Sequence, residues 1–320
     1  MGELEPGASV NDAARTAAMV SAAHASSADD DTGLVSDAYP TLARADPTLW
    51  GLATTSVDGA SFAAGDADAP FVVMSVSKPF VFALVASHLG VREATDRVGM
   101  EATGQPFTAL SSADAVSNPM VNAGAIATSG LVPGDSAADR WATAQAALSA
   151  FAGRELVLDE ETYALARDTN VRNRAIATRL ASAGLLHGDP DDAVDLYTRQ
   201  CCLLVTATDL AAMGATLANG GVHPVTGVRV VNADAARATL VAMTVAGLYE
   251  ASGRWLLDTG LPAKSGIGGG FVAVAPGKGA VGACSPRLDR AGTSVRGARA
   301  CAALARDLEL DLFASSPTGR

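Results

Sequence analysis

A serine and a lysine three positions apart, Ser75 and Lys78, are a pair of residue types that can do chemistry together. On a helix this spacing places two side chains on one face. Because Pro79 is tolerated only in a first turn, we expect a helix to begin at about Val76, with Ser75 at its mouth. Free N–H groups there favour an oxyanion, and a lysine whose pKa is lowered by burial can accept the serine proton. The pair predicts nucleophilic acyl transfer, but a helix cap followed by a surface lysine has the same pattern.

A second motif, Lys264-Ser265-Gly266, favours the chemical interpretation. It resembles the Lys-Ser/Thr-Gly strand segment that accompanies Ser-x-x-Lys in serine β-lactamases and penicillin-binding proteins. The two motifs occur in the expected order, and the second one opens a predicted hairpin. Together they make a nucleophilic serine the better hypothesis.

Two predicted hairpins near opposite ends of the chain must position these motifs. Asp58-Gly59, a dipeptide that favours tight turns, separates the strands expected at 49–54 and 60–64. A Pro-Gly-Lys-Gly turn separates the strands expected at 270–275 and 280–284. The simplest arrangement is one antiparallel sheet built from both chain ends and flanked by helices, with a helical subdomain inserted. This is an α+β fold of the β-lactamase and penicillin-binding-protein kind.

Helical patterns occupy most of the remaining chain. Thr206-x-x-Asp209 is a capping-box-like start, and apolar periodicity predicts further helices at 11–28, 169–183 and 296–313. We expect residues 1–32 to form a loosely held tail and helix, 33–313 one catalytic domain and 314–320 a C-terminal tail. Within the domain we expect an α/β part at about 33–90 and 250–313 and a helical part at about 90–250.

The composition excludes several classes of function. A net charge of −11 over 320 residues argues against binding to nucleic acid. The uncharged run at 115–134 carries Asn118 and Pro119, which suit a structured loop rather than a membrane span. The first residues have neither the basic nor the apolar region of a secretion signal, so we expect a cytoplasmic protein. The four cysteines and four histidines lack metal-binding spacing, and we expect no metal or cofactor.

Residues 118–126, Asn-Pro-Met-Val-Asn-Ala-Gly-Ala-Ile, closely resemble a signature of the serine-dependent glutaminases, which have the β-lactamase-like fold. The resemblance covers about residues 33–313 in constant order, so the chain is identified as a member of this family. Further matching segments are Arg172-Asn173, Tyr197-x-x-Gln200-Cys201, Gly247-Leu248-Tyr249, 260–270, Ser285-Pro286 and 292–295.

The resemblance implies hydrolysis of the side-chain amide of L-glutamine to glutamate and ammonia. Ser75 would be the nucleophile, Lys78 its base, and Tyr249 a proton relay or a stabiliser of the leaving ammonia. The backbone N–H groups of Ser75 and Ile267 would form the oxyanion hole. Family members commonly form homodimers or homotetramers, which we also expect here. The residues implied in substrate binding are Ser75, Asn122, Asn173, Tyr197, Tyr249 and Ile267.

Taken alone, the polar members of this binding set could each have a purely structural role. Asn122 could hold its own loop, and Asn173 could find a backbone partner. Tyr197 and Tyr249 could be core aromatic residues with satisfied hydroxyls. The combined pattern favours the substrate-binding interpretation.

The sequence departs from the family at three substrate-recognition positions. A family tyrosine is replaced by Ala38, with Tyr39 one place along, and a family Gln or Glu is replaced by Met74. A family glutamate, the expected counter-charge for the substrate ammonium, is replaced by Ala166. Loss of such a buried partner typically costs about 2–5 kcal/mol. The acids near this position are Glu160, Glu161 and Asp168.

We therefore expect intact acylation machinery with weakened or altered glutamine recognition. One alternative is an amidase or esterase of the same fold whose substrate lacks a free α-amino group. Another is a non-catalytic, glutaminase-like paralogue, against which the retention of Ser75, Lys78 and Tyr249 argues.

Overall fold

The structure, a computed structural model, describes residues 10–102 and 118–315. A five-stranded antiparallel sheet with the strand order β3-β2-β8-β7-β6 forms its centre. The pairing of β2 with β8 places Thr54 opposite Val281 and joins the two predicted hairpins, which confirms that one sheet is built from both chain ends. The strands are β2 (Gly51–Ser56), β3 (Ser61–Gly65), β6 (Ala263–Ser265), β7 (Gly270–Ala275) and β8 (Gly279–Cys284).

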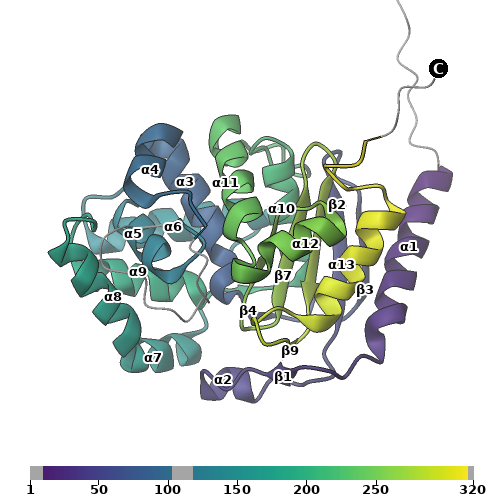
Figure 1. The fold of residues 1–320 in the computed structure, drawn as a ribbon, viewed down its shortest axis with the longest axis horizontal. Coiled ribbons are helices and arrows are strands. Elements are labelled where there is room, and N and C mark those ends of the chain that lie inside the picture. The colour runs from purple at the N-terminus through teal and green to yellow at the C-terminus, as the bar shows by residue number, and fades with distance from the viewer. Residues whose placement is uncertain (1–9, 103–117, 316–320) are drawn as a thin grey trace, which may run out of the picture.

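Helices from both chain ends cover one face of the sheet, where α13 contacts β7 and β8 and α1 contacts β2 and β3. Figure 1 shows α12 and α13 in front of the strands and α1 at the outer edge. Against the other face lies α10, which contacts β2, β7 and β8. These helices are α1 (Val10–Ala28), α10 (Ala207–Ala218), α12 (Ser252–Thr259) and α13 (Val295–Asp307).

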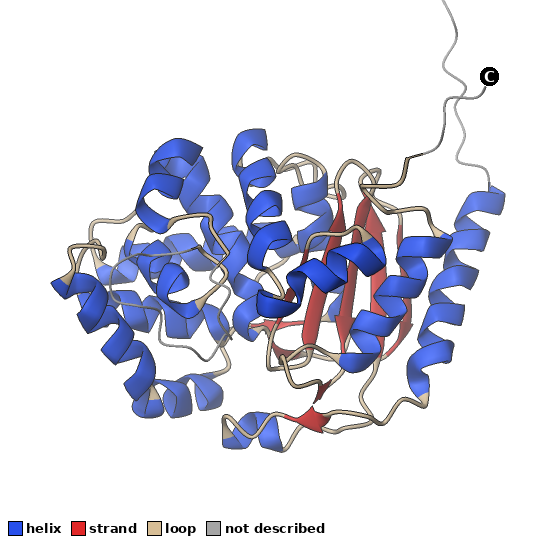
Figure 2. Cartoon of the chain, viewed as in Figure 1, coloured by secondary structure: helices blue, strands red, loops and turns tan. Residues whose placement is uncertain are grey.

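The remaining helices gather on the side of α10 away from α13 and form the helical part, drawn in blue at the left of Figure 2. Their packing is mutual: α5 contacts α8 and α9, and α3 contacts α6 and α11. They are α3 (Lys78–Leu89), α4 (Val91–Val98), α5 (Asn122–Gly130), α6 (Ala137–Ala152), α7 (Glu160–Thr169), α8 (Val171–Ser182), α9 (Pro190–Cys201) and α11 (Ala233–Ala246).

Small elements link the two parts. The short strands β4 and β5 pair with each other, and β4 directly precedes the nucleophile segment. Strand β1 pairs with β9 below the five-stranded sheet in the view of Figure 1. These elements, with the short helix α2, are β1 (Leu34–Val35), α2 (Pro40–Ala43), β4 (Phe71–Val72), β5 (Leu204–Val205) and β9 (Arg287–Leu288).

Helix α10 packs unusually close to the sheet because glycines lie on both sides of the contact. A Cβ atom on Gly214 would lie 2.6 Å from the Cβ of Ala280. On Gly282 of β8 it would lie 2.2 Å from the carbonyl oxygen of Ala207. Such distances are below van der Waals contact, so only glycine permits this approach.

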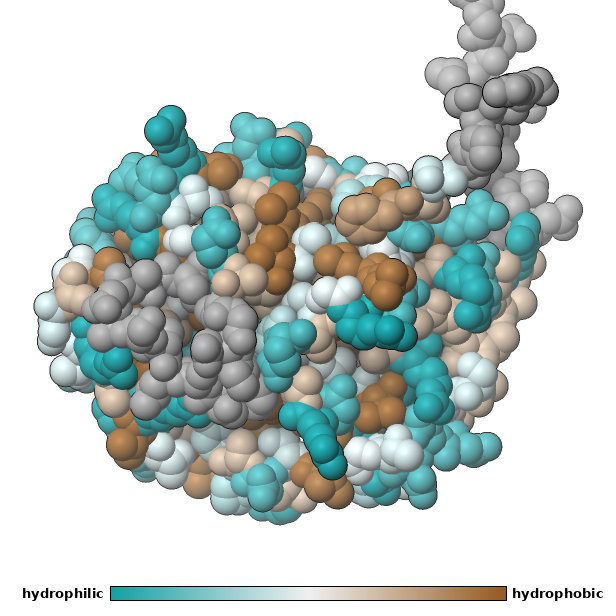
Figure 3. Space-filling view, viewed as in Figure 1, coloured by the Kyte–Doolittle hydropathy of each residue, from teal (hydrophilic) through white to brown (hydrophobic). Residues whose placement is uncertain are grey.

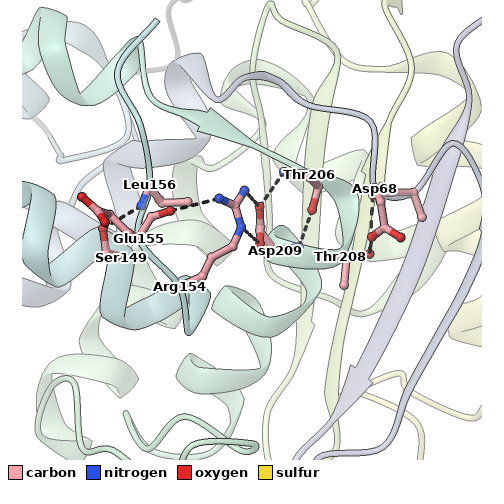
Figure 4. A network of polar contacts seen from close by, with 9 residues as sticks. Asp68, Ser149, Arg154, Glu155, Leu156, Thr206, Thr208 and Asp209 are labelled. Carbon is pink, nitrogen blue, oxygen red and sulfur yellow. Dashed lines mark hydrogen bonds and ion pairs between the residues drawn. The ribbon is translucent and has the colours of Figure 1, made fainter.

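A polar network anchors the first turn of α10 to the helical part (Figure 4). The Arg154 guanidinium donates to Asp209 Oδ1 at 2.9 Å and to Oδ2 at 2.5 Å. Asp209 also accepts from the backbone N–H of Thr206, whose hydroxyl accepts from the N–H of Asp209. The predicted capping box is thereby confirmed.

The predicted end of the C-terminal helix is wrong. This helix ends at Asp307 rather than at Phe313, and Leu312 and Phe313 are exposed. The chain turns after Asp307 because the Leu310 N–H bonds back to the Ala305 carbonyl, which ends the helix. Helix α1 matches its predicted range and packs on the sheet, whereas residues 1–9 and 316–320 of the expected tails lie outside the described residues.

No helix within the described ranges is long and apolar enough to cross a membrane. The same ranges contain no cluster of His, Cys, Asp and Glu that could hold a metal ion. On the described part of the face drawn in Figure 3, hydrophilic and hydrophobic residues are interspersed.

Candidate active site

The nucleophile candidate lies in a tight turn between β4 and α3. Residues Met74–Ser77 form a 3-10 helix, and the α-helix begins at Lys78, so the predicted start at Val76 is wrong by two residues. The 3-10 turn is held by the hydroxyl of Ser77, which donates to the Met74 carbonyl at 2.8 Å. Met74 itself has a φ of 49°. A left-handed backbone at a non-glycine residue costs of order 1–3 kcal/mol and is typical of functional turns.

Lys78 is buried beneath this turn with only 1% of its surface exposed. Its Nζ donates to Asn122 Oδ1 at 2.7 Å and to the Met120 carbonyl at 3.3 Å. Burial disfavours the charged form and lowers the pKa of Lys78 to about 8. About a tenth of this amine is therefore neutral at pH 7, the form that a base requires.

A second buried lysine approaches the site from the edge strand β6. Lys264 Nζ donates to the Tyr249 hydroxyl at 3.2 Å and to the Ser265 carbonyl at 2.8 Å. Burial, followed by repulsion from Lys78, lowers the pKa of Lys264 well below its usual range. Tyr249 has a φ of 56°, so a left-handed backbone also occurs at this position.

Tyr249 joins this lysine to the nucleophile. Burial raises the pKa of Tyr249 to about 12, an effect that a hydrogen bond between its side chain and that of Ser75 opposes. The phenol is therefore protonated at neutral pH. Lys78 also lies near it, with Nζ 6.0 Å from the centre of the Tyr249 ring.

The backbone N–H groups of Ser75 itself and of Ile267 are available for an oxyanion hole. Among the described residues, neither the Ser75 nor the Ile267 N–H donates to a backbone carbonyl. The segment after β6 approaches the nucleophile turn closely: a Cβ atom on Gly266 would lie 3.3 Å from the backbone nitrogen of Ser75. On Gly268 it would lie 2.3 Å from the Val72 carbonyl oxygen. Glycine at these positions lets the two segments meet, as an oxyanion hole requires.

The nucleophile opens into a cavity of about 120 Å³ between the sheet and the helical part. Every residue predicted to bind substrate lines this cavity, and Lys78 lies just below it, bonded to its wall at Asn122. The predicted lining residues are Ser75, Asn122, Asn173, Tyr197, Tyr249 and Ile267.

Hydrogen bonds tie the polar side of this cavity together. Asn122 Oδ1 accepts from the Tyr197 hydroxyl at 3.2 Å, and Asn122 Nδ2 donates to Asn173 Oδ1 at 3.0 Å. Burial raises the pKa of Tyr197 well above its usual value, so its hydroxyl remains a donor. Both asparagines therefore bond to side chains of other elements and not only to nearby backbone.

The three departures from the family pattern meet at this cavity. Met74 and Ala166 both line it, and Ala166 is 3% exposed. Tyr39 lines it too, whereas Ala38 is exposed on the surface. A tyrosine therefore still reaches the cavity from this segment, one position along the chain.

No carboxylate replaces the missing glutamate among the described lining residues. Glu161 lies on the surface in an ion pair with Arg44, and Asp168 lies on the surface beside Arg167. Glu160 is also exposed. The described wall around Ala166 therefore has no negative charge to oppose a substrate ammonium.

Further polar residues of the site were not predicted as contacts. Ser265 lines the cavity, and its hydroxyl is buried without a hydrogen-bond partner among the described residues. Asn170 and Thr198 also line it. Ser265 belongs to the Lys-Ser-Gly motif, and its place in the cavity wall could have been predicted from that motif. Asn170 and Thr198 lie 28 positions apart in the sequence, and their contact depends on how α8 packs against α9.

The sheet and its flanking helices have the β-lactamase-like fold, and relatives at about 50% identity show that the chain is an amidohydrolase. The Glutaminase family model matches residues 33–313, and the chain belongs to this family. It is similar to Glutaminase 2 of Yersinia pestis, with 50% identity over 303 residues that cover 93% of this chain and 89% of the relative.

Two solved structures support the same assignment. The probable glutaminase ybaS superposes with a TM-score of 0.92 at 37% identity, covering 96% of this chain and all of that one. A probable glutaminase from Bacillus subtilis, complexed with 6-diazo-5-oxo-L-norleucine, superposes with a TM-score of 0.83 at 28% identity. That match covers 98% of this chain and all of the Bacillus chain. The predicted fold and family are confirmed.

Proposed function

We propose that the protein hydrolyses L-glutamine to L-glutamate and ammonia through an acyl-enzyme on Ser75. The observation that carries the proposal is the convergence of three groups at one cavity. Ser75 and a protonated Tyr249 both line the cavity, and a buried lysine with a pKa of about 8, Lys78, is hydrogen-bonded to its wall at Asn122. These are the parts of an activated nucleophile.

In the acylation half, neutral Lys78 takes the proton of Ser75 as Oγ attacks the carboxamide carbon. The carbonyl electron pair moves onto oxygen, where the N–H groups of Ser75 and Ile267 stabilise the charge. Collapse breaks the C–N bond, and the proton held by Lys78 passes to the leaving nitrogen with Tyr249 as relay. Ammonia departs and a γ-glutamyl ester remains on Ser75.

In the deacylation half, a water molecule loses a proton to Lys78 and attacks the ester carbonyl. The C–Oγ bond then breaks, Oγ recovers the proton from Lys78, and glutamate is released. The amide groups of Asn122 and Asn173 line the same cavity, and their chemistry suits the substrate α-carboxylate.

Ammonia release from millimolar L-glutamine tests this proposal. Ser75→Ala is expected to lower kcat by at least about 1,000-fold, because no nucleophile remains. Ser129→Ala is the matched control, since Ser129 is a buried serine on α5 whose hydroxyl, among the described residues, bonds to Ala125 and Gln200 in the helical part. Equal loss in both variants, or full activity of Ser75→Ala, would contradict the mechanism.

A second candidate is hydrolysis of a carboxamide whose α-amino group is blocked or absent. Ala166 and Met74 favour it, because they present apolar surface where a counter-charge is expected. On this hypothesis N-acetyl-L-glutamine is cleaved with a kcat/KM at least equal to that for L-glutamine, in a Ser75-dependent manner. A strong preference for free glutamine rejects it.

Restoring a carboxylate at position 166 measures how its absence affects the KM for L-glutamine. Ala166→Glu is expected to lower the KM for L-glutamine by at least about tenfold, since a buried charge-assisted partner is worth about 2–5 kcal/mol. Ala166→Gln adds similar volume without charge and is the control. An unchanged or higher KM in Ala166→Glu would remove this account of the position.

A further inference from the structure

A chain of side-chain hydrogen bonds runs from Lys78 through three asparagines to a threonine on α9. Asn122 Nδ2 donates to Asn173 Oδ1 at 3.0 Å, and Asn173 Nδ2 donates to Asn170 Oδ1 at 2.6 Å. Asn170 Nδ2 then donates to the hydroxyl of Thr198 at 2.7 Å. The chain ends where Thr198 donates to the Val194 carbonyl at 2.6 Å.

We propose that Thr198 and Asn170 are positioning residues that set the orientation of every amide in this chain and so present an oxygen, rather than an NH₂ group, to Lys78. The inference deepens the proposed function, because it concerns how the base of that mechanism is held. Neither residue needs to touch the reacting atoms to act in this way.

The direction of the chain follows from donor and acceptor chemistry. A backbone carbonyl can only accept, so the Thr198 hydroxyl donates its one proton to the Val194 carbonyl. Towards Asn170 the same hydroxyl must therefore be the acceptor. Asn170 therefore points its NH₂ at Thr198 and its oxygen at Asn173. By the same rule, Asn173 turns its oxygen to the NH₂ of Asn122.

The last link fixes the surroundings of the lysine. Because the NH₂ of Asn122 is directed at Asn173, its oxygen faces the Lys78 ammonium at 2.7 Å and the Tyr197 hydroxyl at 3.2 Å. Both lone pairs of this oxygen are then used. A reversed Asn122 would direct N–H groups at Lys78 and leave its ammonium without this acceptor.

Burial makes a reversal elsewhere in the chain costly. Thr198 is 4% exposed and Asn170 is 6% exposed, so a donor or acceptor left unpaired at either residue has little access to bulk water. The two residues come from different elements, α9 and the residue between α7 and α8. This series of hydrogen bonds therefore also connects α8 to α9 at the cavity.

The test uses the titration of Lys78, which can be followed without turnover. The protein sequence contains only three lysines, Lys78, Lys264 and Lys278, so selective ¹³C,¹⁵N-lysine labelling gives three side-chain signals. Single Lys→Arg variants assign them. Lys278 lies on the surface away from the cavity and reports on general changes.

Thr198→Val removes the hydroxyl while keeping the shape. We expect the titration midpoint of Lys78 to fall by at least about half a pH unit, because its charged form loses a fixed acceptor. We expect kcat for L-glutamine to fall about tenfold, because the base is no longer held in place. Thr198→Ser, which keeps the hydroxyl, is expected to restore both values.

Thr239→Val is the matched control. Thr239 is fully buried, and its hydroxyl bonds to the carbonyl four residues earlier, as in Thr198, but it lies on α11 outside the cavity. It should lower stability without moving the Lys78 signal. If Thr198→Val fails to fold, Asn170→Ala breaks the same link from the other side and is expected to shift Lys78 in the same direction.

An unchanged Lys78 midpoint in folded Thr198→Val or Asn170→Ala overturns the inference, as does an equal shift in Thr239→Val. This failure is distinct from failure of the proposed function. The former is seen in the lysine spectra of any folded variant, whereas the latter is seen as absent or Ser75-independent ammonia release by the unmodified protein.

Discussion

At the scale of residues, the site is built around two buried lysines that meet at one tyrosine. Lys78 and Lys264 are 1% and 0% exposed, and no ion pair with a carboxylate compensates either of them among the described residues. Each amine instead donates to neutral oxygens, on Asn122 and Met120 for the first and on Tyr249 and Ser265 for the second. Neutral partners stabilise an ammonium less than a carboxylate does, so burial controls both pKa values.

This arrangement predicts the pH dependence of the reaction. A base must be neutral to accept a proton, and the pKa of Lys78 is about 8. We expect kcat/KM for L-glutamine to rise about tenfold per pH unit well below pH 8 and to level off above it. Steady-state ammonia release between about pH 5.5 and 9.5 measures the profile. A plateau that begins below about pH 6.5 would show that another group controls the rate.

At the scale of elements, the contact between α10 and the sheet depends on two glycines. Gly282→Ala places a methyl group against the backbone of α10, and Gly214→Ala places one against Ala280 and Val272. Overpacking of this kind costs about 1–3 kcal/mol. We expect both substitutions to lower the urea midpoint of unfolding, and Gly282→Ala to lower it more because backbone yields less than side chains.

Gly253 provides the opposite control within the same chain. It lies exposed in α12, and a Cβ atom there meets no atom of the described residues within 4 Å. Gly253→Ala is therefore expected to raise stability by about 0.5–1 kcal/mol through helix propensity and a less flexible unfolded chain. If all three alanines shifted the midpoint equally, close packing would not be the cause.

The sequence indicated those elements whose signals are local. Asp58-Gly59 marks the first hairpin, and Thr206 with Asp209 marks the start of α10, because turn and cap chemistry depends on adjacent residues. The 3-10 turn at Met74–Ser77 was missed. Its backbone is held by the Ser77 hydroxyl and by contact with the glycine segment after β6, and neither constraint is visible in periodicity.

The site residues divide in the same way, into those identified by local motifs and those that depend on contacts between elements. The family motifs identified the cavity residues that adjoin the nucleophile, and the structure brings these together. Alignment on Pro40 did not decide whether Tyr39 lines the cavity in place of the family tyrosine. Which of two adjacent residues reaches the cavity depends on the path of the chain there. Asn170 and Thr198 were missed because their link joins two helices.

At the scale of the whole molecule, α1 completes the fold although it precedes the region matched by the family model. Val20 and Ala23 are buried in the cluster that includes Trp50 and Leu304. His24 stacks on Trp50 at 5.2 Å between ring centres, and its carbonyl accepts from the Trp50 indole at 3.0 Å. The helix is thus part of the core on the face of the sheet that α13 also covers.

Deletion of residues 1–28 is therefore expected to lower the melting temperature by about 5–8 °C. Loss of two buried side chains and the Trp50 hydrogen bond removes about 3–5 kcal/mol. Residues 10–28, the described part of this segment, do not line the cavity, so kcat at about 20 °C should stay within about twofold of the full-length value. Scanning calorimetry and ammonia release measure the two effects, and Val20→Ala should give a smaller loss of the same kind. An unchanged melting temperature would show that α1 contributes little.

The pairing of β2 with β8 has a consequence for biosynthesis. About 220 residues separate the end of β2 from the start of β8. At roughly 5–20 residues per second, a ribosome needs about 10–45 s to make that stretch. Throughout this interval the amino-terminal hairpin has an apolar face and an open hydrogen-bonding edge, which other nascent chains can join. Chaperones that shelter such an edge would raise the yield of native enzyme, whereas a higher density of nascent chains would lower it.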